Sequence, residues 1–188
     1  MKGTIHYCLE ETIVERFGLD MWHKCAKESG FGRDFTFVKM IRDDIDEQQS
    51  SNLFVKSAEV LGISLKELFD FFGEHFCCTY APSLYGAFYA GISTTKKALT
   101  KIDWVHDRVT RNIPNAAPPK FDHNWHDENT LELTYKSTRG LIDLLISLIG
   151  GLNKYFNDAC RVTKLSQTVI LVEFIEGEGH TEVIDKTN

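Results

Sequence analysis

Apolar residues in the first part of the chain recur at the spacing of amphipathic helices. Near the start they stand at four-residue intervals: Ile5, Leu9, Ile13 and Phe17. Residues four apart lie on one face of a helix, so this pattern predicts a helix that Gly18 closes. A second helix is expected to open at Asp20 and to end at Gly30.

Two further helices are predicted before residue 80. The acidic stretch Arg42–Gln49 is expected to be a solvated loop that leads into a helix ending at Gly62. Ser64 and Glu67 have the spacing of a capping box, in which each side chain bonds the other residue's backbone amide at a helix start. The helix after them should turn five apolar side chains inward: Leu65, Leu68, Phe69, Phe72 and Phe76.

The pattern changes near residue 114. Residues 83–113 are helical in pattern, with a break near residues 91–95, and prolines end them: Pro114, Pro118 and Pro119. Residues 130–139 alternate between an apolar and a polar face, which is the period of a β-strand. Later elements are predicted in the same way: an apolar helix over residues 140–156 and strands over 161–166 and 168–175. The polar tail after Gly177 is expected to be frayed.

Together these elements predict an α+β domain, with a helical N-terminal part followed by helices packed on one side of an antiparallel sheet. The length of 188 residues and a hydrophobic content of 43% fit one globular domain. Thirteen phenylalanines suit either a large core or a pocket for a flat apolar ligand.

Charge and cysteine content narrow the function classes. The net charge of −6, with Lys96-Lys97 as the one basic doublet, argues against a nucleic-acid partner. Asp143 interrupts the longest apolar run, so no membrane partner is expected. The five cysteines are odd in number, and no apolar leader follows Met1. Free thiols and a cytoplasmic protein are therefore expected.

The most informative stretch is Tyr135-Lys-Ser137-Thr-Arg139. If the strand period continues through it, a phenol, a hydroxyl and a guanidinium share one face with Leu131 and Leu133. Three donors beside apolar surface suit an anionic group attached to an apolar body, because arginine offers a planar fork to a carboxylate. The alternative is a sheet edge with Arg139 in water.

His106 is the second candidate. It lies on a helix predicted over residues 96–113, among apolar neighbours at helical spacing: Ile102, Val105 and Val109. A lone helical histidine is usually a structural residue rather than a ligand. Here, however, Pro118 and Pro119 follow 12 and 13 residues later, and Tyr135 follows 29 residues later.

These features resemble the H-NOX (haem–nitric oxide/oxygen binding) family, which is related to the haem domain of soluble guanylate cyclase. The resemblance rests on three stretches in order: residues 1–5 (Met-Lys-Gly-Thr-Ile), 103–109 followed by Pro118-Pro119, and 135–139. It covers essentially the whole chain. It implies one haem-binding domain over residues 1–188, with a distal helical subdomain (1–62), a proximal subdomain with the sheet (63–188) and the haem buried between them.

The resemblance also implies a role for each matched residue. His106 matches the proximal ligand of the iron in a non-covalent b-type haem. Tyr135, Ser137 and Arg139 match the motif that binds the haem propionates. Pro119 matches the proline that presses on the porphyrin, and Ile5 matches a haem contact on the first helix. A c-type attachment is excluded independently, because the sequence has no Cys-x-x-Cys-His.

The resemblance further implies a nitric oxide sensor of the bacterial stand-alone type, without enzymatic activity. Oxygen-binding members have a distal tyrosine nine residues after the motif tyrosine, where this chain has Leu144, and some have a tryptophan at the position of Leu9. Nitric oxide and carbon monoxide are therefore the expected ligands. Signalling is expected through cleavage of the Fe–His106 bond and movement of haem and helix, toward a separate histidine kinase or cyclic-di-GMP enzyme.

Two other functions stay open on the sequence. A peroxidase- or oxygenase-like haem enzyme needs a distal acid or base, and no polar side chain is evident on the distal helix. A haem-free helical protein could bind a fatty acid through Arg139, which would make His106 incidental. A second metal site at His75 with Cys77-Cys78 is not favoured, because adjacent cysteines on a helix splay apart. The histidines of His123-Asn-Trp-His126 are expected to be solvated in a hairpin loop.

Overall fold

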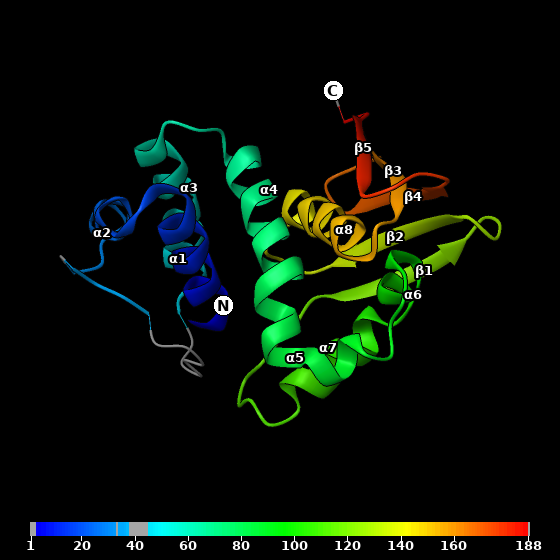
Figure 1. Ribbon diagram of the computed structural model, residues 1–188, viewed down its shortest axis with the longest axis horizontal. Coiled ribbons are helices and arrows are strands. Elements are labelled where there is room, and N and C mark those ends of the chain that lie inside the picture. The colour runs from blue at the N-terminus through cyan, green and yellow to red at the C-terminus, as the bar shows by residue number, and fades with distance from the viewer. Residues whose placement is uncertain (1–2, 33, 38–44, 188) are drawn as a thin grey trace.

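The computed structural model describes residues 3–32, 34–37 and 45–187. Helices form the first part of the chain and a sheet forms much of the last part (Figure 1). Four helices come first: α1 (Gly3–Phe17), α2 (Leu19–Glu28), α3 (Glu47–Leu61) and α4 (Leu65–His75). The predicted helices α1 and α2 are confirmed. The end of the loop expected over Arg42–Gln49 is already helical, because α3 begins at Glu47, and residues 42–44 lie outside the described residues.

Local capping fixes where α3 and α4 begin and end. The Asp46 side chain accepts hydrogen bonds from two backbone amides in the first turn of α3. Gly62 ends the helix with a φ of 69°, a conformation that glycine adopts without steric cost. Ser64 and Glu67 form the predicted capping box. Leu65 was expected in the core but is 36% exposed, because it lies in the first turn at the outer end of α4.

The middle of the chain is divided into short helices. A π-helical turn η1 (Phe76–Tyr80) leads into α5 (Ala81–Tyr89), and α6 (Thr95–Thr100) and α7 (Ile102–Thr110) follow. The break expected near residues 91–95 is confirmed. The single helix expected over residues 96–113 is wrong, because Lys101 leaves the helical conformation (φ −102°, ψ 5°) and separates α6 from α7. His106 therefore lies on a helix of nine residues.

The sheet has five strands in the order β1-β2-β4-β3-β5. Their bounds are β1 (Lys120–Trp125), β2 (Thr130–Lys136), β3 (Ala159–Lys164), β4 (Val169–Ile175) and β5 (His180–Asp185). The predicted strands at β2, β3 and β4 are confirmed. His123, expected in a loop, lies on β1.

The C-terminal tail corrects two expectations about the sheet. Residues after Gly177 are not frayed but form β5, which pairs in parallel with β3, so the sheet is not wholly antiparallel. All other neighbouring strands are antiparallel. A polar segment can still form this strand because it lies at the edge of the sheet, where backbone pairing with β3 is satisfied and side chains can remain in water.

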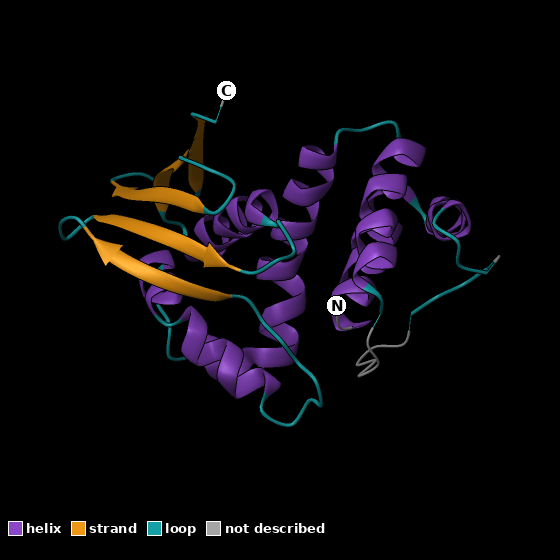
Figure 2. Cartoon of the chain, turned by 180° about the vertical axis from the view of Figure 1, so that it is seen from behind, coloured by secondary structure: helices purple, strands orange, loops and turns teal. Residues whose placement is uncertain are grey.

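Helix α8 (Ile142–Phe156) joins the helical part to the sheet. It covers one face of the sheet and packs along α4 (Figures 1 and 2). Two glycines permit this close packing, because a Cβ on Gly151 would lie 2.1 Å from the carbonyl oxygen of Gly73. One apolar cluster, which includes Leu144, lies among helices α1 to α4, and a second lies between α8 and the sheet.

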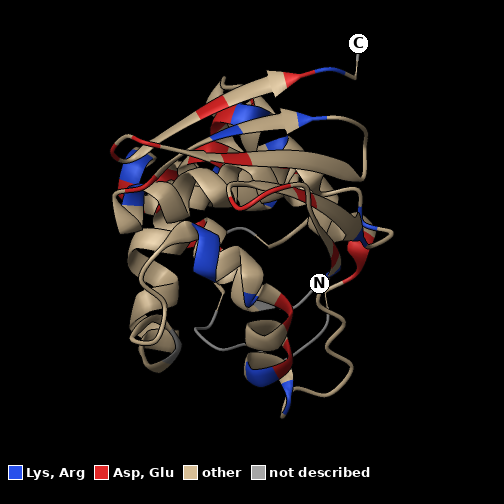
Figure 3. Cartoon of the chain, turned by 90° about the vertical axis from the view of Figure 1, so that its right-hand side faces the viewer, with Lys and Arg blue, Asp and Glu red and all other residues tan. Residues whose placement is uncertain are grey.

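Acidic and basic side chains are interspersed over the described chain (Figure 3). None of the helices in the described ranges has the length and apolar character of a membrane span. All five cysteines lie in the described part of the chain, and each has a free thiol there, as predicted.

Candidate functional site

His106 is held in one tautomer by the loop that follows its helix. Its Nδ1 atom lies 3.2 Å from the carbonyl oxygen of Pro119, and a carbonyl can only accept, so Nδ1 carries the proton. Burial lowers the pKa of His106, which favours the neutral ring. In a neutral imidazole with Nδ1 protonated, Nε2 keeps its lone pair. The hydrogen bond to Pro119 therefore prepares Nε2 to act as a ligand.

Two more contacts tie α7 to the first two residues of β1, which directly follow Pro119. The Asp107 carboxylate pairs with the Lys120 ammonium group, and Asp103 Oδ2 accepts a hydrogen bond from the backbone amide of Phe121 at 3.3 Å. No residue of α7 is fully buried. The position of this helix is thus set in large part by three contacts with three consecutive residues, 119–121.

Phe121 connects His106 to the sheet. Its ring centroid lies 6.2 Å from that of His106 and 5.8 Å from that of Tyr135. Tyr135 is only 4% exposed and belongs to the cluster between the sheet and α8. Within the described residues its hydroxyl group makes no hydrogen bond, so this donor is available to a bound group.

The strand alternation expected through Tyr135 and Arg139 stops before Arg139. Strand β2 ends at Lys136, and the chain turns at residues 138 and 139. The backbone amide of Arg139 donates a hydrogen bond to the Ser137 hydroxyl oxygen at 3.4 Å. In the Arg139 side chain, Nη1 donates to the carbonyl oxygen of Ala117 at 2.6 Å. This contact with Ala117, rather than strand geometry, positions the guanidinium. Ala117 lies two residues before Pro119, whose carbonyl oxygen binds His106.

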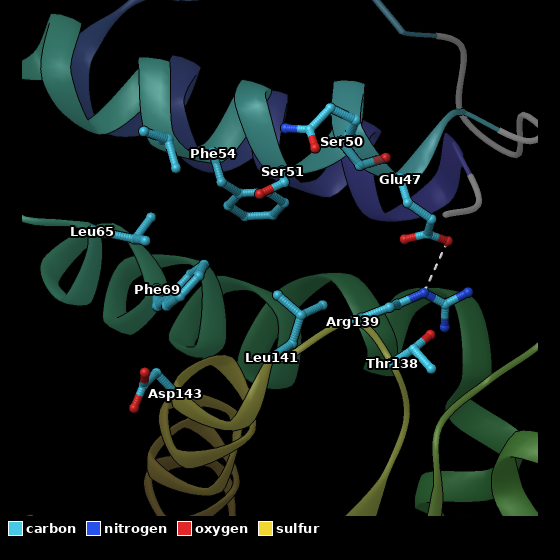
Figure 4. A pocket seen from close by; sticks show the side chains of 13 residues that line it. Glu47, Ser50, Ser51, Phe54, Leu65, Phe69, Thr138, Arg139, Leu141 and Asp143 are labelled. Atoms are coloured by element: carbon cyan, nitrogen blue, oxygen red, sulfur yellow. Dashed lines mark hydrogen bonds and ion pairs between the residues drawn. The ribbon is translucent and has the colours of Figure 1, made fainter. Parts of the chain in front are cut away.

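A second donor of the Arg139 guanidinium points to the helical part of the molecule. Its Nε lies 2.9 Å from Oε1 of Glu47, the first residue of α3 (Figure 4). The two residues border a cleft of about 360 Å³. Its apolar lining comes from α3, α4 and the start of α8: Phe54, Val55, Leu65, Phe69 and Leu141. The cleft thus has a charged mouth and an apolar wall.

Ile5 and Leu144 lie in a different part of the structure from Tyr135. Leu144, in the first turn of α8, is 7% exposed and belongs to the apolar cluster among helices α1 to α4. Ile5 on α1 is partly buried against the same cluster, and Leu9 is fully buried in it. The structure therefore places these apolar residues with the helical part, whereas His106 is linked to Pro119 by a hydrogen bond and to Tyr135 through the Phe121 ring on β1.

The family follows from a comparison with known domains. A family model described as haem-NO-binding matches residues 2–164, which is most of the chain. The chain belongs to this H-NOX family. H-NOX domains are haem-based gas sensors, so the sequence-based assignment to the family and the predicted α+β fold are confirmed.

Solved H-NOX structures share the fold at low identity. The unliganded Fe(II) form of an H-NOX mutant from K. algicida is 21% identical, with a TM-score of 0.80 over 94% of this chain and 97% of that one. An oxygen-binding H-NOX domain related to soluble guanylate cyclases, in its oxygen complex, is 23% identical, with a TM-score of 0.77 over 94% and 96%. Because one such structure holds oxygen, the H-NOX fold alone does not determine which gas is bound.

A curated relative is much longer than this chain. Soluble guanylate cyclase gcy-37 from Caenorhabditis elegans is 23% identical over 154 residues, which cover 79% of this chain and 21% of the relative. The chain therefore spans about a fifth of the length of that cyclase.

The side chains of this H-NOX domain fit a haem. An imidazole Nε2 with its lone pair available suits iron, and the hydroxyl groups of Tyr135 and Ser137 with the Arg139 guanidinium suit carboxylates. Part of this donor set is unused within the described residues: the Tyr135 hydroxyl group and Nη2 of Arg139 make no hydrogen bond there. The donor chemistry thus matches a flat apolar cofactor that carries two acidic groups.

Three residues of the candidate site were missed by the sequence analysis. Asp103 and Phe121 tie α7 to β1, and Glu47 pairs with Arg139. Asp103 could have been found, since it lies one helical turn before His106. Glu47 gives no local signal, because 92 residues separate it from Arg139.

Proposed function

We propose that this H-NOX domain binds a non-covalent b-type haem through Nε2 of His106 and serves as a nitric oxide sensor. The observation that carries the proposal is the hydrogen bond from Nδ1 of His106 to Pro119, because it fixes the tautomer that leaves Nε2 as the ligand. Metal-binding histidines commonly donate their other ring N–H to a backbone carbonyl in this way.

The acidic groups of the haem would be held by Tyr135, Ser137 and Arg139. Arginine offers a charged fork for a carboxylate, and each of the two hydroxyl groups can donate one further hydrogen bond to it. In the same proposal Pro119 presses against one face of the porphyrin, while Ile5 and Leu144 contact it from the helical side. The distal subdomain is then residues 1–62 and the proximal subdomain residues 63–188.

Signal transmission is proposed to run through α7. Bound ferrous haem would supply an iron atom that His106 could hold through Nε2 and that could bind nitric oxide. If the tie between His106 and the haem were weakened, α7 would keep its contacts with Lys120 and Phe121 through Asp107 and Asp103. A shift of α7 would therefore move residues 119–121 as well, and with them the nearby Ala117 contact to Arg139.

Selectivity for nitric oxide over oxygen is proposed from the residues expected near the gas. Bound oxygen is polar and is stabilised by a hydrogen-bond donor, whereas nitric oxide needs none. Ile5, Leu9 and Leu144 have no donor in their side chains. Carbon monoxide should bind for the same reason as nitric oxide.

The proposed output is regulation of a separate protein, without catalysis by the domain itself. A histidine kinase or a cyclic-di-GMP enzyme is the partner class that family resemblance suggests. The outer face of α7 supports such a contact, because Trp104 is 50% exposed there and Arg108 lies over its ring.

Reconstitution tests this proposal. The purified protein, titrated with haemin and then reduced without oxygen, should bind one haem per chain and show the absorption of ferrous haem with a single histidine ligand. Acid–acetone should extract the haem unmodified, as expected for a non-covalent b-type group. A protein that binds no haem, or that keeps the porphyrin after extraction, would contradict the proposal.

A further inference from the structure

We infer that Glu47 competes with the acidic groups of the haem for Arg139, so that cofactor binding releases Glu47 from this arginine. The inference rests on the proposed function, since it takes Arg139 as part of the haem site. It adds a residue on α3 that limits how tightly the cofactor is held.

The contact itself shows that Arg139 is already engaged. Its Nε binds a Glu47 carboxylate oxygen at 2.9 Å, and its Nη1 binds the Ala117 carbonyl oxygen at 2.6 Å. Side chains of both residues of the ion pair lie at the mouth of the cleft, with the dashed contact joining α3 to the loop before α8 (Figure 4). A carboxylate that approached this guanidinium would meet it next to an existing carboxylate.

The charges around the cleft make simultaneous binding unfavourable. Arg139 is the one basic residue among the described residues that line the cleft, and Glu47 and Asp143 are acidic. Asp143 is paired with Lys164 at 2.6 Å, so Arg139 faces Glu47 as its nearest opposite charge. A second carboxylate at Arg139 would lie beside the Glu47 carboxylate, and the repulsion between these like charges favours displacement of Glu47.

The expected size of the competition is modest. The Arg139 side chain is 21% exposed and that of Glu47 is 51% exposed. Ion pairs that are this exposed to water are weak. Forming one changes the equilibrium constant between the paired and unpaired states by about two- to fivefold. A competing contact of that strength reduces the apparent affinity for another ligand by the same factor.

Glu47→Gln tests the inference, because it removes the charge and keeps the size of the side chain. The rate of haem loss from the reconstituted protein to excess apomyoglobin should fall about two- to fivefold. In the haem-free protein the same substitution removes a native ion pair, so its urea midpoint should fall slightly. A residue that merely supported the structure would weaken both properties, whereas a competitor weakens one and strengthens the other.

Two controls complete the experiment. Glu59→Gln makes the same charge change near the other end of α3, where Glu59 pairs with Lys56, and should leave haem loss unchanged. In an Arg139→Ala background, Glu47→Gln should have no further effect on haem loss. If the wild-type protein holds haem but Glu47→Gln releases it as fast or faster, the inference is wrong and the proposed function stands. If the wild-type protein binds no haem, the proposed function fails first and the inference fails with it.

Discussion

The Nδ1 atom of His106 donates a hydrogen bond to the carbonyl oxygen of Pro119, 3.2 Å away. This bond joins the candidate ligand to a loop whose earlier residue, Ala117, accepts a hydrogen bond from Arg139. The loop therefore connects the residue proposed to bind iron with a residue proposed to bind a propionate. A displacement of α7 would therefore change both the Pro119 contact and the Ala117 contact.

Replacing His106 with glycine should remove the axial ligand without unfolding the protein. No residue of α7 is fully buried, and a glycine in a helix costs only about 1 kcal/mol. The His106→Gly protein should lose the wild-type ferrous absorption and regain it when imidazole is added. His126→Gly, in the β1–β2 hairpin, is the matched control and should behave as the wild type. A wild-type spectrum of His106→Gly without imidazole would refute the ligand assignment.

Arg139→Ala should weaken haem retention more than Ser137→Ala. The Arg139 guanidinium is itself charged and can present a two-pronged fork to a carboxylate, whereas the neutral Ser137 hydroxyl group can donate only one hydrogen bond. The rates of haem transfer to apomyoglobin measure the difference directly. Equal rates for both variants and the wild type would show that this motif does not hold the cofactor.

The packing of α8 on α4 predicts opposite effects at two adjacent glycines. A Cβ at Gly151 would lie 2.1 Å from the backbone oxygen of Gly73, so Gly151→Ala should destabilise the fold by about 3 kcal/mol or more. A Cβ at Gly150 meets only the Thr181 hydroxyl oxygen at 3.7 Å. Gly150→Ala should therefore stabilise the helix by roughly 0.5–1 kcal/mol. Urea unfolding of both variants tests the pair, and similar effects at the two positions would contradict this packing.

Glu10 should make stability depend on pH near neutrality. Burial raises its pKa to about 7, against a smaller opposing effect of the hydrogen bond from the Phe37 amide. The folded protein thus keeps a proton that the unfolded chain loses above about 4.5, so stability should fall as pH rises from about 4.5 to 7. Glu10→Gln should remove this loss, which is on the order of 3 kcal/mol for a pKa raised from 4.5 to about 7. Urea midpoints at pH 5 and pH 8 give the comparison, and identical pH dependence in both proteins would show that Glu10 does not titrate in this range.

Local sequence signals predicted much of the fold. The capping box of Ser64 and Glu67, the helix ending at Gly18 and the strand from residue 130 depend on neighbours within a few positions, and all are present. Strand β5 was missed because its polar sequence carries no apolar period and is stabilised by pairing with β3. The break at Lys101 was missed because no glycine or proline marks it in the sequence.

The candidate site could be predicted less completely. The spacing of His106, Pro119 and Tyr135 indicated residues that the structure connects through Pro119 and Phe121. The strand expected over residues 130–139 was wrong beyond Lys136, so its alternation does not position Arg139. Glu47 could not be inferred, since only the folded chain brings α3 to the loop before α8.

The most direct test of the account is the absorption spectrum of the reduced, haem-loaded wild-type protein in air-saturated buffer. Stable nitric oxide and carbon monoxide complexes should form, and no oxygen complex should appear, because Leu144 and its apolar neighbours offer no donor. Tyr80 lies in the same cluster as Leu144 and has a buried hydroxyl group without a partner in the described structure. A stable oxygen complex would mean that a donor such as this hydroxyl group reaches the gas, and it would contradict a sensor selective for nitric oxide.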